Sequence, residues 1–126
     1  MNSPPTRPPT VLDAAALERL CELDPKGQNQ LLERVLKAFE ASVSRLVPQL
    51  LQARAAADSA AVRHVAHTLK SSSASIGALT LSQMCADIEA SARAGTLDLK
   101  GPGIDDMSRE IEFVLQALKQ LLQRTS

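Results

Sequence analysis

Apolar residues recur three and four positions apart through most of this 126-residue chain, which is the spacing of an amphipathic helix. The longest such run lies between residues 28 and 56 and contains Pro48. Because the apolar pattern continues past this proline, we predict one kinked helix there rather than two helices. The five helices that the pattern predicts span residues 13–23, 28–56, 58–76, 80–95 and 104–124.

Polar residues and glycines indicate where these helices begin and end. Asp58 or Ser59 is a suitable N-cap for the third helix. The segment Thr80-Leu81-Ser82-Gln83 has the form of a capping box that opens the fourth helix, and Gly95 is a natural C-cap for it. The sequence Gly101-Pro102-Gly103 predicts a loop before the fifth helix.

Long amphipathic helices joined by short connections predict an all-α fold, an antiparallel up-down-up-down four-helix bundle with an additional short N-terminal helix. Its core should be aliphatic, because the chain has no Trp, no Tyr and two Phe residues. Residues 1–10 are rich in proline and predict a disordered tail, so the bundle domain is expected over residues 11–126. This Pro-rich start with its own Met1 favours a whole protein or a tailed domain over a piece of a larger kinase.

The charge of the chain indicates which kinds of partner it can bind, and its cysteines indicate the cellular compartment. The formal net charge is zero, which argues against nucleic acid or an anionic membrane as the partner. Locally, no acidic residue lies between Asp58 and Asp87, so the third helix should be mildly positive. Cys21 and Cys85 form no CxxC pair, and the chain has neither a membrane-length apolar run nor a signal peptide. We therefore expect a cytoplasmic protein with reduced thiols.

His67 occupies an unusual place on the third predicted helix. At about 100° per residue, the apolar stripe falls on one side of the helical wheel and His67 points away from it. The stripe consists of Val62, Val65, Leu69 and Ile76. The side of His67 carries Arg63, His64, Lys70, Ser71 and Ala74. An imidazole on the solvent side, flanked by cations and small residues, is placed for access rather than for packing.

The run Ala66-His67-Thr68-Leu69-Lys70-Ser71-Ser72-Ser73, followed by Gly77-Ala78, resembles the signature of histidine phosphotransfer (HPt) domains. In that family the usual form is Ala-His-x-Leu-Lys-Gly-Ser-Ser with Gly-Ala after it. Ser71 stands here where the family usually has glycine. The resemblance covers about residues 30–95. It implies a phosphocarrier without kinase activity, whose histidine exchanges a phosphoryl group with receiver-domain aspartates.

The resemblance also implies roles for the residues around the histidine. His67 would carry the phosphoryl group, since a neutral imidazole is available near neutral pH. Lys70, one turn later, would neutralise charge on the phosphoryl oxygens. Glu89 in the fourth helix matches a position that in some members holds a Gln that steadies the ring, and here it is either such an orienting group or a plain surface residue.

We expect partners to dock on the same face, with Arg63 and His64 as rim charges and with Ser71 and Ala74 leaving room for approach. The expected partners are receiver domains of a hybrid sensor kinase and of a response regulator, bound by a monomer. No cofactor is expected. His64 and His67, three residues apart and without a third ligand, do not form the pattern of a zinc site.

The three serines after Lys70 could also suggest a serine nucleophile. Ser72 and Ser73 lack the partners of a serine nucleophile, so we interpret them as small packing residues at a helix crossing. The alternative function is a helical-bundle adaptor that docks a signalling partner through the same face but transfers no phosphate. The presence of both His67 and Lys70 favours transfer.

Overall fold

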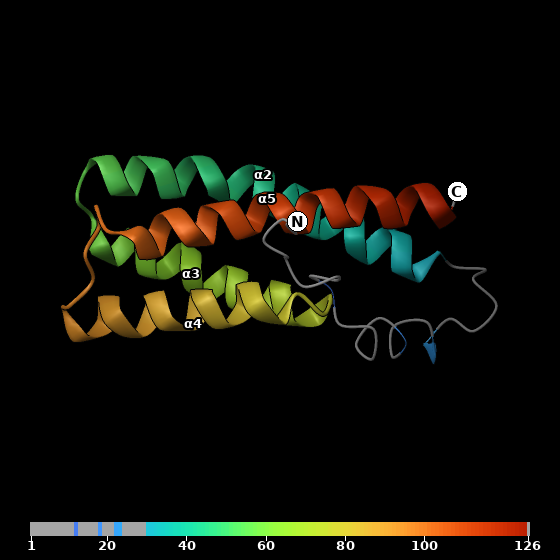
Figure 1. Ribbon diagram of the computed structural model, residues 1–126, viewed down its shortest axis with the longest axis horizontal. Helices are drawn as coiled ribbons and strands as arrows, with labels where there is room; N and C mark the ends of the chain where they lie inside the picture. The colour runs from blue at the N-terminus through green and yellow to red at the C-terminus, as the bar shows by residue number, and fades with distance from the viewer. Residues whose placement is uncertain (1–11, 13–17, 19–21, 24–29, 126) are drawn as a thin grey trace, which may run out of the picture.

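The computed structural model describes residues 12, 18, 22–23 and 30–125. Residues 30–125 form four helices, α2 (Leu31–Ala55), α3 (Ser59–Ser75), α4 (Leu79–Ala94) and α5 (Pro102–Thr125). Helices adjacent in the chain run in opposite directions (Figure 1). Since α2 packs on α3 and α5, and α4 also packs on α3 and α5, the four helices close into the predicted antiparallel bundle. The predicted tail over residues 1–10 and most of the predicted helix over residues 13–23 lie outside the described residues.

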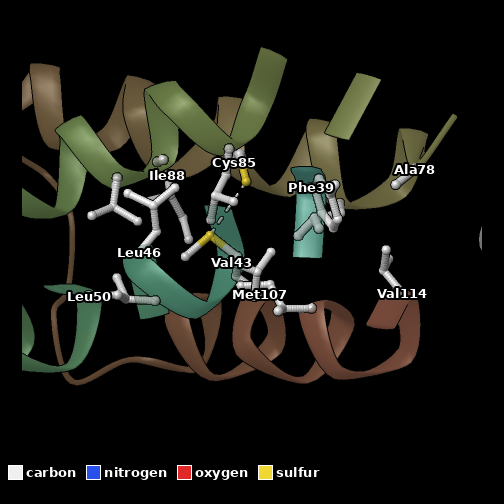
Figure 2. Packing of buried hydrophobic residues seen from close by; sticks show 14 of the residues in the cluster. Phe39, Val43, Leu46, Leu50, Ala78, Cys85, Ile88, Met107 and Val114 are labelled. Carbon is white, nitrogen blue, oxygen red and sulfur yellow. Dashed lines mark hydrogen bonds between the residues drawn. The ribbon is translucent and has the colours of Figure 1, made fainter. Parts of the chain in front are cut away.

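The core is the aliphatic one that the sequence predicts. The apolar stripes of all four helices form one buried cluster, and Figure 2 shows part of it, with labelled side chains that include Phe39 of α2, Ile88 of α4 and Met107 of α5. The Cys85 thiol belongs to this core and lies 3.7 Å from the Met107 sulfur. The side chains that are buried to 1 % exposure or less include Leu36, Leu50, Val62, Leu69, Ile76, Leu81, Ile104, Met107, Ile111 and Leu118.

Helix α2 is one helix with Pro48 inside it, as predicted in place of two helices, and it ends close to the predicted position. It begins at Leu31 rather than near residue 28. The reason is the backbone of Gln30, whose φ of 52° and ψ of 40° lie in the left-handed region and therefore outside the helix.

Asp58 is the N-cap of α3, one of the two residues predicted for this role. Its carboxylate accepts a hydrogen bond of 3.1 Å from the Ala61 backbone N–H, which satisfies one of the donors left free at a helix start. The first turn of the helix that carries His67 is thus fixed independently of the packing around that residue.

The predicted capping box at the start of α4 is wrong, because the connection from α3 to α4 is made differently. Gly77, at a φ of 81°, turns the chain at once, and the Ala78 N–H donates to the Ser73 carbonyl at 2.8 Å. Helix α4 therefore begins at Leu79 with Ala78 as its N-cap and without a side-chain cap. Thr80 lies inside the helix, and the amide of Gln83 bonds Asp87 instead of reaching back to the cap.

The start of α5 also differs from the prediction of a loop at Gly101-Pro102-Gly103. Pro102 is the first residue of α5 and Gly103 lies in its first turn. A proline suits this position because its missing N–H would have no partner inside the helix and its φ is already helical. At the other end of α4, Gly95 is the C-cap with a φ of 76°, as predicted.

The loop between α4 and α5 is held by an arginine from α2. Arg54 donates from Nε to the Leu99 carbonyl at 2.7 Å and from Nη1 to the Asp105 carboxylate at 2.6 Å. The pKa of Asp105 is lowered, first because Arg54 hydrogen bonds to it. These contacts fix the end of the bundle at which α2 and α4 terminate. The site described below lies away from this end, in the middle of α3 and α4.

Candidate functional site

His67 and Lys70 of the sequence motif meet Glu89 where α3 packs against α4. His67 and Lys70 project from the middle of α3, and Glu89 projects toward them from α4. Small residues at the helix crossing allow this approach, since Ala66 and Ser73 of α3 are both fully buried. Ser73 is thus a packing residue, as predicted, while the half-buried Ser72 donates to the Thr68 carbonyl in its own helix.

Glu89 is the centre of the arrangement. Its side chain is 6 % exposed, so the alternative of a plain surface residue is wrong. Oε2 of the carboxylate lies 2.7 Å from Nδ1 of His67, and Oε1 lies 2.6 Å from Nζ of Lys70. These two contacts, with that of Lys70 the larger, hold the pKa of Glu89 down to about 2 against the opposing effect of burial. The group is therefore a carboxylate at any physiological pH.

The ionised state of Glu89 fixes the tautomer of His67. A carboxylate only accepts hydrogen bonds, so Nδ1 of the ring must carry the proton that it donates to Oε2. In the neutral imidazole, Nε2 then holds a lone pair. The His67 side chain is 61 % exposed, in contrast to its buried partner, which makes Nε2 the accessible atom. The site presents a nucleophilic nitrogen to solvent.

Lys70 is more constrained than a solvated surface lysine. Its side chain is 36 % exposed and its ammonium group is bonded to Glu89. Its backbone is held as well, because the Ser82 hydroxyl of α4 donates to the Lys70 carbonyl at 2.9 Å. The spacing of the motif predicted that Lys70 lies beside His67. It did not predict that, in the absence of a phosphoryl group, the ammonium group bonds to the Glu89 carboxylate.

The sequence pattern did not predict two residues that contact the cluster of His67, Lys70 and Glu89. One is Ser82, which anchors the Lys70 backbone. The other is Arg93, whose Nη2 lies 3.3 Å from Oε2 of Glu89 and whose side chain is 66 % exposed. The spacing of four between Glu89 and Arg93 is the signal that would have found the second, since such pairs meet on a helix surface.

The residues predicted to contact partners lie on the solvent side of α3. Arg63, His64, Ser71 and Ala74 are all exposed, which agrees with their place on the helical wheel. Among the described residues, no group of three or more His, Cys, Asp or Glu side chains is placed to hold a metal ion. No helix in the described part of the chain is long and apolar enough to cross a membrane.

Comparison with known proteins matches this geometry to one family. Residues 34–126 match the Hpt domain. The chain belongs to the Hpt domain family. A crystal structure of histidine-containing phosphotransfer protein B (HptB) from Pseudomonas aeruginosa PAO1 matches with a TM-score of 0.74 and 32 % sequence identity, over 93 % of this chain and 98 % of that one. A search of curated proteins found no match.

Membership confirms the resemblance seen in the motif around His67. Hpt proteins are phosphocarriers rather than kinases and interact with receiver domains in two-component phosphorelays. The chain therefore has a phosphotransfer role in such a relay.

Proposed function

We propose that this Hpt domain is a phosphorelay intermediate in which Nε2 of His67 accepts a phosphoryl group from a receiver-domain aspartate and passes it to the aspartate of a second receiver. The observation that carries the proposal is the hydrogen bond of 2.7 Å between Nδ1 of His67 and Oε2 of Glu89. It directs the lone pair of the exposed ring to Nε2, the atom that a partner can reach.

In the accepting step, the Nε2 lone pair forms a bond to phosphorus while the bond from phosphorus to the aspartyl oxygen breaks. The electron pair of that bond stays on the aspartate, which leaves as a carboxylate. The ring gains positive charge as the new bond forms, and the Nδ1–H that shares this charge faces the carboxylate of Glu89 at 2.7 Å. Glu89 thus stabilises the positive charge that develops on the ring during this step. Donation to the second receiver reverses the step.

Lys70 is the cation available for the phosphoryl oxygens. It lies one helical turn from His67, and its flexible side chain, 36 % exposed, can turn from Glu89 toward Nε2. Arg63, His64, Ser71 and Ala74 form the exposed face on which we propose that the receiver docks. Since that face carries no acidic residue, it complements the acidic phosphorylation site of a receiver. A cytoplasmic location and a monomeric state are part of the same proposal.

Phosphorylation with isotopically labelled phospho-receiver tests the assignment. We expect one equivalent of a phosphoramidate, labile in acid and stable in base. His67→Gln should abolish the label. His64→Gln removes the other histidine of the chain, so label that this variant holds at the end point, whatever its rate, must be on His67. Normal labelling of His67→Gln would refute the proposal.

The same experiment distinguishes the adaptor alternative. An adaptor would bind phospho-receivers and leave their label in place, and His67→Gln would then bind as the wild-type protein does.

A further inference from the structure

The Glu89 carboxylate has three donors around two oxygens, and they are unequally placed. Oε2 contacts Nδ1 of His67 at 2.7 Å and Nη2 of Arg93 at 3.3 Å. Among the described contacts, Oε1 is bonded to Lys70 alone, at 2.6 Å. The buried carboxylate therefore depends on Lys70 for one of its two oxygens.

This dependence conflicts with the use of Lys70 in phosphoryl transfer. When the ammonium group turns to the phosphoryl oxygens, Oε1 loses its partner while the side chain that carries it is only 6 % exposed. A buried carboxylate oxygen without a hydrogen-bond donor is costly, even though Oε2 keeps His67 and Arg93. It would also draw Lys70 back and so oppose the contact that transfer needs.

Arg93 is the cation placed to resolve the conflict. It lies on α4 one turn beyond Glu89 and already contacts the carboxylate by one long hydrogen bond. Its side chain is 66 % exposed and so is free to shift. A guanidinium group has five N–H donors in a fork that can bind both oxygens of one carboxylate. Lys70, with its single compact charge, is the better group to move to a phosphoryl oxygen.

We propose that Arg93 is a positioning residue that takes over the Glu89 carboxylate when Lys70 turns to the phosphoryl group on His67. Two cations thus share one anion, the lysine at rest and the arginine after transfer. This inference rests on the proposed function for its biological setting, but the exchange itself can be tested without phosphate.

The first test follows the Arg93 guanidinium by side-chain ¹⁵N NMR. In unphosphorylated Lys70→Ala, the lysine is absent, so the Arg93 signal should shift and the rotation of the guanidinium group should slow as it binds both carboxylate oxygens. Phosphorylation of the wild-type protein should produce the same change. Arg109 serves as the control in the same spectrum, because it lies on α5, is 65 % exposed and contacts Asp106 at the same 3.3 Å.

The second test measures the rate of transfer from a phospho-receiver. Arg93→Gln should slow transfer roughly three- to tenfold, in the lower part of the range for a coupled pair of side chains, and Arg93→Lys should recover part of the loss. Arg109→Gln should transfer at the wild-type rate. A simple structural role of Arg93 would change stability but would leave the NMR response to Lys70→Ala absent.

The NMR and rate measurements test the exchange and the proposed function separately. If the Arg93 signal is the same in wild type and Lys70→Ala, the exchange is refuted whether or not the protein carries phosphate. If that signal responds but no receiver labels His67, the proposed function fails while the competition for Glu89 stands. An unchanged transfer rate in Arg93→Gln would refute the role of the exchange in transfer.

Discussion

The ammonium group of Lys70 on α3 lies 2.6 Å from Oε1 of Glu89 on α4, in a pair whose carboxylate side is 6 % exposed. The lysine that the motif marks for phosphoryl contact is therefore part of an interhelical ion pair at rest. Such a pair is held more firmly than one at the surface, because the carboxylate is shielded from water. Mutations of Lys70 should consequently affect stability as well as transfer.

Lys70→Ala should slow transfer from a phospho-receiver by at least about tenfold, since a charged contact to developing charge is worth at least this much. It should also cost more than the roughly 0.5 kcal/mol usual for surface substitutions, because the buried Glu89 loses its closest partner and a more exposed arginine replaces that contact only in part. Urea denaturation measures the second effect. The control is Lys37→Ala, which removes an exposed i,i+4 pair with Glu33; equal losses in the two variants would contradict the prediction.

Glu89→Ala should change the tautomer of His67. Without the acceptor at 2.7 Å, the proton is no longer held on Nδ1 and the Nε2–H form becomes populated, which blocks the nucleophilic atom. The ¹⁵N shifts of the ring report this directly, and transfer should slow in parallel. Glu89→Gln keeps an oxygen acceptor and should retain the Nδ1–H form. The prediction fails if alanine and glutamine give the same ring spectrum.

Acid should destabilise the wild-type protein more than Glu89→Gln. The pKa of Glu89 is lowered from 4.5 to about 2, so its stabilising contribution is complete above pH 4.5 and is lost as pH falls toward 2. The variant has no proton to take up at this position. Urea midpoints measured from pH 7 to pH 2 should therefore fall more steeply for wild type. Asp105, whose pKa is also lowered, titrates in both proteins, and parallel curves would show that Glu89 contributes nothing.

Ser71→Leu should block transfer while the fold stays intact. Ser71 is exposed one turn beyond His67, where a bulky side chain obstructs a partner that approaches Nε2. Ser44→Leu makes the same change at an exposed position of α2 and should transfer normally. Labelling by a receiver gives the rates, and circular dichroism checks the fold. Normal transfer by Ser71→Leu would rule out this face as the docking site.

The Cys85 thiol should be inert in the folded protein. Burial, more than the nearby Glu89, raises its pKa from 9.0 to about 12, which lowers the thiolate fraction roughly a thousandfold at a given pH. In a Cys21→Ser background, a thiol reagent at pH 8 should label Cys85 only after denaturant is added. Rapid labelling under native conditions would contradict both the burial and the raised pKa.

The sequence was sufficient for the bundle because each helix buries one continuous apolar stripe, and the period of that stripe is local information. It was also sufficient to place His67 on the exposed side of α3, opposite Leu69. It failed at the α3–α4 connection, because Thr80 and Gln83 imitate a capping box whereas Gly77 and the Ser73 carbonyl determine where the turn is made.

The inner part of the site could be predicted only in part. Glu89 was recognised as a possible partner of the ring, but its burial depends on how closely α3 and α4 pack, which periodicity does not state. Ser82 was missed for the same reason, whereas the spacing of four between Glu89 and Arg93 on one helix was a local signal that could have been used. Ser82 acts through its contact with α3 and Arg93 through its contact with the buried Glu89 carboxylate, and neither residue belongs to the linear motif.

The bond from the Ser82 hydroxyl to the Lys70 carbonyl ties α4 directly to the helix that carries His67. Together with Gly77 at the turn, it fixes the register of α3 against α4, so every contact of the His67–Glu89 cluster lies within one helical hairpin. Helices α2 and α5 support this hairpin from outside and contribute no atom to the cluster among the described contacts. Substitutions at solvent-facing positions of α2 and α5 should therefore leave the contacts of the cluster in place, provided that the shared core is kept.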